Sequence, residues 1–220
     1  MKPVIYYCYD AYCGWCYGFS PVISQVAETY RGRIDFETLS GGMIPRESAR
    51  HISHIAAYIK DAYKIVEDTT GVSFGEDYLW HIRNPDLSDW FPHSEKAAVA
   101  LTIFKEYLPE SSVECAAELQ RALHVEGRDL TDDEAYRHLL EPWGIPADEF
   151  YAKLKDDTYL EKARYEMELV RQLRVNSFPA VLMQTGDLKF YLVSKGYTDL
   201  ETLTLRIENI IRETEARLTE

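Results

Sequence analysis

Two cysteines separated by two residues, Cys13 and Cys16, are the side chains of this sequence most able to do chemistry. On a helix that spacing places their thiols about one turn apart, close enough to form a disulfide without moving the backbone. A disulfide that opens and closes reversibly exchanges electrons with another pair of thiols. The spacing therefore predicts a redox-active site.

The two cysteines are expected to have different roles. If a helix begins near Gly14, Cys13 lies at its N-terminal edge, where unpaired amide N–H groups and the positive end of the helix dipole favour thiolate over thiol. Cys16, one turn inside and less exposed, would then resolve the mixed disulfide that Cys13 forms with a partner. We therefore predict that Cys13 is the nucleophile and Cys16 the resolving cysteine.

Two metal sites are alternative interpretations of the same cysteines. A zinc site normally needs a second pair of Cys or His ligands with short spacing, and the sequence offers none. An iron–sulfur cluster matches better, because Cys8, Cys13 and Cys16 follow a C-x4-C-x2-C pattern and Cys115 could be the fourth ligand. We favour a site with neither metal nor organic cofactor, because Cys8 lies in a predicted strand. Cys8 and Cys115 are then expected to pack as small apolar side chains.

The overall charge limits the classes of partner. The 220 residues carry a formal net charge of −13, which opposes binding to nucleic acid or to anionic lipid. No apolar stretch resembles a signal peptide or a membrane span, so we expect a cytoplasmic protein with no membrane partner. In that compartment thiols are kept reduced, and a CxxC pair is more often catalytic or metal-bound than a structural disulfide.

The residues around the cysteines predict a strand, a helix and a second strand. Val4–Tyr9 is aromatic and β-branched, as a buried strand would be. Apolar residues at helical spacing follow over residues 19–30, interrupted by Pro21. Residues 34–39 alternate apolar and polar side chains as a second strand would, and Gly41-Gly42 ends it. These elements predict a βαβ unit with parallel strands.

The rest of the chain changes from helical to sheet character. Residues 45–174 show apolar side chains at helical spacing, with an irregular stretch and a short helix expected at residues 71–93. Residues 180–184 and 189–194 flank a turn signal at Gly186-Asp187, which predicts an antiparallel hairpin, and a last helix follows. Ser/Thr-x-x-Glu patterns predict capped helix starts at Ser111, Thr131 and Thr198.

This order of elements resembles the DsbA family of the thioredoxin-fold superfamily, over essentially the whole chain. The run YDAYCGWCYGF around the cysteines is similar to the cytoplasmic branch of predicted protein-disulfide isomerases, the FrnE-like proteins. The resemblance implies an α/β, thioredoxin-like fold in which a βαβ unit and a ββα unit enclose a large all-helical insertion. It divides the chain into a thioredoxin-like domain of residues 1–44 and 175–220 and a helical insertion domain of residues 45–174.

The resemblance also implies where a substrate binds. In the family a cis-proline faces the CxxC pair, and Pro179 stands at the matching position. A substrate chain pairs there with the residue before the proline, which is Phe178 in this sequence. The expected substrate-binding residues are therefore Gly14, Trp15, Phe178 and Pro179.

Three residues next to the cysteines have weaker assignments. The carboxylate of Asp10 is expected to cap the loop between strand and helix, with a proton relay near Cys16 as the alternative. Tyr12 and Trp15 flank the cysteines and could contact an apolar substrate. None of the six histidines is expected to be catalytic.

The predicted function is thiol–disulfide exchange by an oxidoreductase or isomerase. Its partners would be proteins or small molecules that contain thiols or disulfides, glutathione among them. Because Gly14-Trp15 lacks the histidine that DsbA carries between its cysteines, the resemblance implies a weaker oxidant.

Two alternative functions remain open. One is a glutathione-dependent isomerase or transferase of the kappa or hydroxychromene-carboxylate isomerase type, whose members share the helical insertion. The other is a non-catalytic adaptor that uses the two cysteines as a redox switch.

Overall fold

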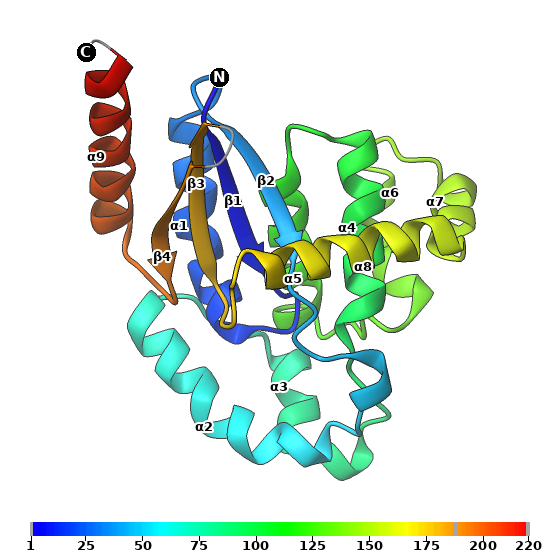
Figure 1. The fold of residues 1–220 in the computed structure, drawn as a ribbon. Coiled ribbons are helices and arrows are strands. Elements are labelled where there is room, and N and C mark those ends of the chain that lie inside the picture. The colour runs from blue at the N-terminus through cyan, green and yellow to red at the C-terminus, as the bar shows by residue number, and fades with distance from the viewer. Residues whose placement is uncertain (1, 187–188, 219–220) are drawn as a thin grey trace.

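The computed structural model describes residues 2–186 and 189–218 of the chain. A four-stranded sheet carries the fold, with the strand order β2-β1-β3-β4 (Figure 1). β1 and β2 are parallel, whereas β3 is antiparallel to both β1 and β4. The predicted βαβ unit and closing hairpin are thus confirmed, although Asp187 of the predicted turn lies outside the described residues. The strands are β1 (Val4–Tyr9), β2 (Asp35–Ser40), β3 (Ala180–Gly186) and β4 (Lys189–Lys195).

Helices surround this sheet, and most of them lie between β2 and β3 in the sequence. This arrangement confirms an α/β, thioredoxin-like fold with a helical insertion. The division into domains at residues 45 and 174 stays a prediction. The helices are α1 (Gly14–Thr29), α2 (Ser53–Thr70), α3 (Glu76–Arg83), α4 (Ser94–Tyr107), α5 (Ser112–His124), α6 (Arg137–Leu140), α7 (Ala147–Leu154), α8 (Asp157–Gln172) and α9 (Leu200–Leu218), with short 3-10 helices η1 (Arg46–Ser48), η2 (Pro85–Leu87) and η3 (Asp133–Tyr136).

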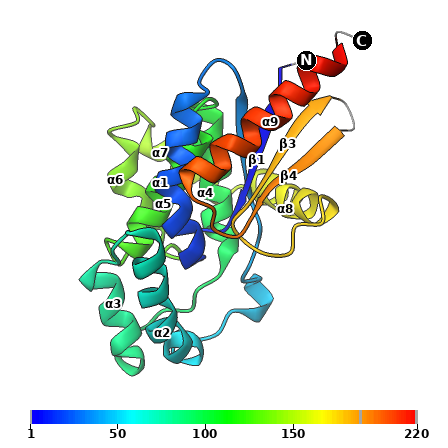
Figure 2. The same cartoon turned by 90° about the vertical axis from the view of Figure 1, so that its left-hand side faces the viewer.

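Alternation of side chains along β1 separates two apolar clusters. Ile5, Tyr7 and Tyr9 point to one face and join the main core, together with the buried side of α1. Cys8 points to the other face and packs in a smaller cluster with Val170 of α8. Figure 2 shows α1 and α9 on the same side of the sheet, whereas α8 crosses the opposite side in Figure 1. The two redox cysteines and Cys8 therefore lie on different faces of the sheet.

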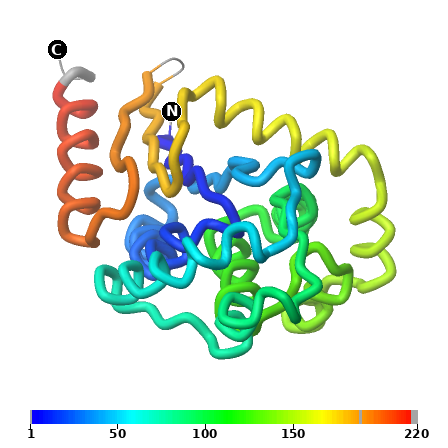
Figure 3. The backbone as a smooth tube through the Cα atoms, turned by 90° about the horizontal axis from the view of Figure 1, so that it is seen from below, coloured from blue at the N-terminus to red at the C-terminus, as the bar shows by residue number. Residues whose placement is uncertain are grey.

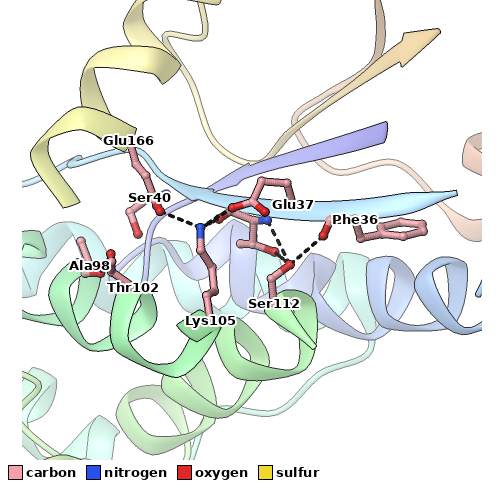
Figure 4. A network of polar contacts seen from close by, with 9 residues as sticks. Phe36, Glu37, Ser40, Ala98, Thr102, Lys105, Ser112 and Glu166 are labelled. Atoms are coloured by element: carbon pink, nitrogen blue, oxygen red, sulfur yellow. Dashed lines mark hydrogen bonds and ion pairs between the residues drawn. The ribbon is translucent and has the colours of Figure 1, made fainter. Parts of the chain in front are cut away.

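A buried ion network attaches α4 and α8 to β2 (Figure 4). The ammonium group of Lys105 donates to Glu166 at 2.6 Å, to the carbonyl oxygen of Thr38 at 3.0 Å and to Glu37. Burial opposes the charge of Lys105, but the two carboxylates outweigh burial and raise the pKa of the Lys105 side chain. Because the Glu166 side chain is only 12% exposed, its charge depends on this lysine for compensation.

Replacement of Lys105 by methionine is expected to destabilise the fold. Lys105→Met keeps the packing of the aliphatic stem but leaves Glu166 buried without a cation, which lowers the free energy of unfolding by about 3 kcal/mol. The control is Lys155→Met, which removes a lysine that is 71% exposed and should change stability by less than about 1 kcal/mol. Urea denaturation of both variants measures the difference, and equal effects would contradict the assigned role of the network.

The helix that carries the cysteines packs directly against α2. A Cβ atom on Gly18 of α1 would approach side-chain atoms of Val66 and Thr70 of α2 at 2.8 Å, so a larger residue there would force the two helices or these side chains to move. The hydroxyl of Tyr17 donates to the carbonyl oxygen of Ser73 at 2.8 Å, just beyond the end of α2. Figure 3 shows α2 lying next to α1. The sequence predicted α2 as a helix but not this contact.

Two of the three predicted helix caps are displaced by one residue, and the third lies at the predicted position. The N-cap of η3 is Asp132, whose side chain accepts a hydrogen bond from the amide of Glu134, so Thr131 is not the cap. Before α9, Asp199 accepts from the amide of Thr202 at 2.8 Å, again one residue after the predicted threonine. Ser111 is the N-cap of α5 but its side chain makes no capping bond. In the first two cases an aspartate, an equally good N-cap, follows the threonine and takes the position.

Candidate active site

The first turn of α1 presents Cys13 at the start of the helix. The structure begins α1 at Gly14 with Cys13 as its N-cap, which confirms the predicted helix start. The sulfur of Cys13 accepts a hydrogen bond from the backbone amide of Cys16 at 3.3 Å. The Cys13 amide in turn donates to the carbonyl oxygen of Asp10 at 3.1 Å. The Cys16 amide is thus the helix amide that points at this sulfur.

Phe178 and Pro179, more than 160 residues later in the chain, lie against the same cysteine. The Cys13 thiol is 3.7 Å from the carbonyl oxygen of Phe178, and the Phe178–Pro179 peptide bond is cis, as the resemblance implies. The Phe178 ring packs on Gly41 at the end of β2, where a Cβ atom would lie 1.9 Å from the ring. The structure therefore brings Cys13, Cys16, Gly14, Phe178 and Pro179 together, while their roles in binding stay a prediction.

The two thiols differ in environment. Cys13 is 7% exposed, whereas Cys16 is completely buried, and both are free. Burial raises the pKa of Cys16 well above its usual value, and the hydrogen bond and charge of Cys13 raise it further. Tyr7, which the sequence did not single out, places its buried hydroxyl 3.4 Å from the Cys16 carbonyl oxygen and donates to it. Cys16 is thus held as a thiol behind Cys13.

Asp10 links three segments that surround the cysteines. Its carboxylate accepts hydrogen bonds from the Tyr12 amide at 3.0 Å, the Met43 amide at 2.7 Å and the Ser94 hydroxyl at 3.0 Å. These donors come from the loop before α1, the segment after β2 and the first residue of α4. The predicted role of Asp10 in capping the loop is confirmed, and the carboxylate also fixes two distant segments next to the site.

The buried Asp10 carboxyl should leave a signature in the pH dependence of stability. Burial raises its pKa, although hydrogen bonds from Met43, Tyr12 and Ser94 oppose the effect. Between the unfolded value of about 4 and the raised folded value, the folded protein binds more protons than the unfolded chain. The Asp10 contribution to the free energy of unfolding therefore falls as pH rises through this window and is constant above it. Urea denaturation from pH 4 upward should show this fall in the wild type relative to Asp10→Asn, whereas parallel pH profiles would contradict it.

An apolar cavity of about 250 Å³ opens beside Cys13. The motif contributes Tyr12, Gly14 and Trp15 to its wall, and Phe178 lines it as well. Ionisable side chains among its lining residues are confined to Cys13 and tyrosines. The opposite wall is one face of α2 together with the residue before it, formed by Ile52, Ile55, Tyr58, Ile59, Ala62, Tyr63 and Val66. The apolar spacing of these residues predicted a helix, but no sequence signal indicated that it faces Cys13.

The other two cysteines and a histidine next to the loop before α1 are buried. Cys8 and Cys115 are completely buried, as expected for small apolar side chains. Nε2 of His124 donates to the carbonyl oxygen of Ala11 at 3.1 Å, and burial lowers the pKa of His124 to about 3. It therefore stays neutral at physiological pH. Within residues 2–186 and 189–218, no three His, Cys, Asp or Glu side chains gather closely enough to hold a metal ion.

The chain matches one protein family over almost its whole length. The model of the family described as DSBA-like thioredoxin domain matches residues 4–208. None of the curated protein sequences matches the chain significantly. Among the described residues, no helix is long and apolar enough to cross a membrane.

Several solved structures share the fold. A candidate protein disulfide isomerase from Nitrosomonas europaea has a TM-score of 0.82 and 24% identity, with 97% of this chain and 99% of that chain covered. The cytosolic disulfide reductase DsbM from Pseudomonas aeruginosa has a TM-score of 0.67 and 24% identity, with 98% and 99% covered. Its structure with GSH gives 0.66 and 23%, with 95% and 99% covered. A 2-hydroxychromene-2-carboxylate isomerase has a TM-score of 0.65 and 13% identity, with 99% and 100% covered. At these identities the likeness shows the fold alone.

Proposed function

The chain belongs to the family of DSBA-like thioredoxin domains, and we propose that it is a thiol–disulfide oxidoreductase in which Cys13 attacks and Cys16 resolves. One observation carries this proposal. The Cys13 sulfur lies at the N-terminus of α1, within 3.3 Å of a helix amide, and also lines a cavity that a substrate can enter. A thiolate in that position is both stabilised and reachable, which are the two requirements of an attacking cysteine.

The proposed reaction has two displacements. The Cys13 thiolate attacks one sulfur of a substrate disulfide, forms a mixed disulfide and releases the other substrate sulfur as a thiolate, which takes up a proton. Cys16 then loses its proton and attacks the Cys13 sulfur, which releases the second substrate thiol. The substrate disulfide is reduced and the Cys13–Cys16 pair is oxidised to a disulfide. Run in reverse, the same steps oxidise a dithiol substrate.

The order of the two steps follows from the charges around Cys16. While Cys13 is a free thiolate, its negative charge and its hydrogen bond help to keep Cys16 protonated. Once Cys13 is bound in a mixed disulfide, that charge is gone and the Cys16 thiol ionises more easily. Attack by Cys16 is therefore favoured only after a substrate has been captured.

We propose that the substrates are proteins whose cysteine is flanked by apolar residues. The cavity beside Cys13 is apolar, and three of its lining side chains, Met43, Ile55 and Tyr58, are exposed large apolar residues that a substrate could contact. Trp15 and Phe178 would contact the substrate, with Gly14 and Pro179 shaping the groove between them.

The compartment and the small-thiol partner are part of the same proposal. DsbM is described as a cytosolic disulfide reductase, and one of its structures contains GSH. We propose by analogy a cytoplasmic location and glutathione as a thiol that can recharge the cysteine pair. The resemblance implies that the isomerase and transferase relatives activate glutathione with a serine, so the pair of cysteines favours thiol–disulfide exchange over that alternative.

Catalysed reduction of insulin by glutathione, followed as turbidity, tests the proposal. We expect the protein to accelerate the reaction catalytically and its dithiol to equilibrate with glutathione at a potential below the roughly −120 mV of DsbA. Stoichiometric reaction without turnover would instead support the redox-switched adaptor. Tight binding of glutathione by a Cys13→Ser, Cys16→Ser double variant, with no turnover of insulin by the wild type, would support the transferase.

A further inference from the structure

A second hollow lies on the other side of the segment that follows β2. Gly42 and Ile44 line this hollow of about 390 Å³, whereas Met43 and Ile44 line the apolar cavity beside Cys13. The segment thus separates two hollows of opposite character. Three arginines and two glutamates supply the ionisable side chains of the second hollow: Arg46, Glu47, Glu95, Arg164 and Arg171.

The arginines of this hollow are held in place but remain open to solvent. Glu95, only 12% exposed, pairs with Arg46 at 3.4 Å and with Arg164 at 2.8 Å. Arg171 pairs with Glu168 on its own helix at 2.8 Å. The arginine side chains are nevertheless 59–68% exposed. Since each guanidinium carries five N–H donors, one carboxylate shared between two arginines leaves donors for a ligand.

A third, smaller hollow places two further cationic side chains at the loop that carries the cis-proline. Asn176 and Ser177, just before Phe178, line this hollow of about 210 Å³. Arg174 and Lys195 line it as well, and its described lining residues include no carboxylate. Arg174 follows the end of α8, which leads into the loop before β3 (Figure 1). We refer to Arg46, Arg164, Arg171, Arg174 and Lys195 as the cationic strip.

The two hollows are together lined by five cationic side chains and two carboxylates, whereas carboxylates outnumber cations in the chain as a whole. The chain carries a net charge of −13, which by itself would disfavour acidic substrates. The strip lies next to Phe178, whose carbonyl oxygen contacts the Cys13 thiol. Gly42, which lines the second hollow, directly follows Gly41, and the Phe178 ring packs on Gly41. An extended chain advances about 3.3 Å per residue, so residues one to three positions from a bound cysteine would lie over the strip.

We propose that the cationic strip binds carboxylates next to the reacting sulfur, so that this protein prefers acidic thiol or disulfide substrates in spite of its own negative charge. The preferred substrate then has an apolar residue on one side of its cysteine and acidic residues on the other. The inference rests on the proposed function, because it names the substrate class of the same cysteine pair.

Peptide disulfides that differ only in the flanking residues test the proposal. With Glu in place of Gln beside the cysteine, kcat/KM should rise at least threefold at low salt, and Lys should lower it below the Gln peptide. High salt should remove most of the difference, because the arginines are exposed. The variant Arg46→Gln, Arg171→Gln should lose the preference. Its matched control, Arg83→Gln, Arg137→Gln, removes two exposed arginines that pair with glutamates elsewhere and should keep it.

Glutathione disulfide and its tetraester, which keeps the two ammonium groups but has no carboxylate, distinguish the two sources of a carboxylate. A faster reaction of the free acid, lost in the Arg46→Gln, Arg171→Gln variant, supports the strip with glutathione as a ligand. A preference seen with peptides alone supports the strip with acidic peptides as ligands. Equal rates for Glu, Gln and Lys peptides, or faster reaction of Lys peptides, would overturn the inference while leaving the proposed function intact. Failure of every peptide and of glutathione to react would instead refute the proposed function on which the inference rests.

Discussion

Cys13→Ser is expected to reduce turnover of a disulfide substrate at least a hundredfold, to the rate of the uncatalysed exchange. A serine hydroxyl can occupy the N-cap of α1 as well as the Cys13 sulfur does, so the helix should form normally. The loss would therefore report the missing nucleophile. Insulin reduction and circular dichroism, measured on the same preparation, separate loss of chemistry from loss of fold.

Cys16→Ser should fail in a different way. Without the resolving thiol, Cys13 still attacks but the mixed disulfide persists, so mass spectrometry should find one substrate attached through Cys13. The matched control is Cys8→Ala, which removes a buried sulfur from the opposite face of the sheet and should retain turnover. Wild-type turnover by Cys13→Ser, or loss of turnover in a folded Cys8→Ala, would contradict the assigned roles.

Filling the apolar cavity should change substrate preference more than intrinsic reactivity. Ala62 lines the cavity from α2, and Ala62→Trp would occupy much of its volume of about 250 Å³. We expect kcat/KM for a disulfide peptide with Phe or Leu beside the cysteine to fall at least tenfold, because the apolar flank loses its binding space. The reaction with a small disulfide that does not need the cavity should change less than threefold.

Ile65→Trp provides the control for this substitution. Ile65 lies on the same helix, is 56% exposed and does not line the cavity, so a tryptophan there adds the same side chain outside the site. Its kinetics should match those of the wild type for both kinds of substrate. An equal loss in the two variants would assign the effect to α2 in general, and no loss in Ala62→Trp would exclude the cavity from substrate binding.

Local sequence predicted the part of the site that is continuous in the chain. The strand before Cys13, the helix start at Gly14 and the strand after it follow from residue type and periodicity, and the structure confirms them. The place of Pro179 came from the resemblance and not from local pattern. The structure confirms that Phe178 and Pro179 lie at Cys13. They lie there because β3, which follows them, pairs antiparallel with β1, which precedes Cys13.

The rest of the site depends on contacts between distant residues, which periodicity does not encode. Asp10 was predicted to cap its own loop, but its bonds to Met43 and Ser94 depend on how β2 and α4 pack. The apolar face of α2 could have turned to any part of the core, and the fit of Gly18 against Val66 directs it to the cysteines. The caps moved by one residue because Asp132 and Asp199 compete with the predicted threonines.

The central claim is that Cys13 is the one reactive sulfur of the four, and alkylation followed by peptide mapping tests it most directly. Burial raises the pKa of Cys8 to about 12 and that of Cys115 to about 12, and it raises the pKa of Cys16 well above its usual value. In the reduced, folded protein at pH 7, brief exposure to iodoacetamide should therefore label Cys13 at least tenfold faster than any other cysteine. Labelling of Cys13 as slow as that of Cys8 and Cys115, with the protein still folded, would contradict the account.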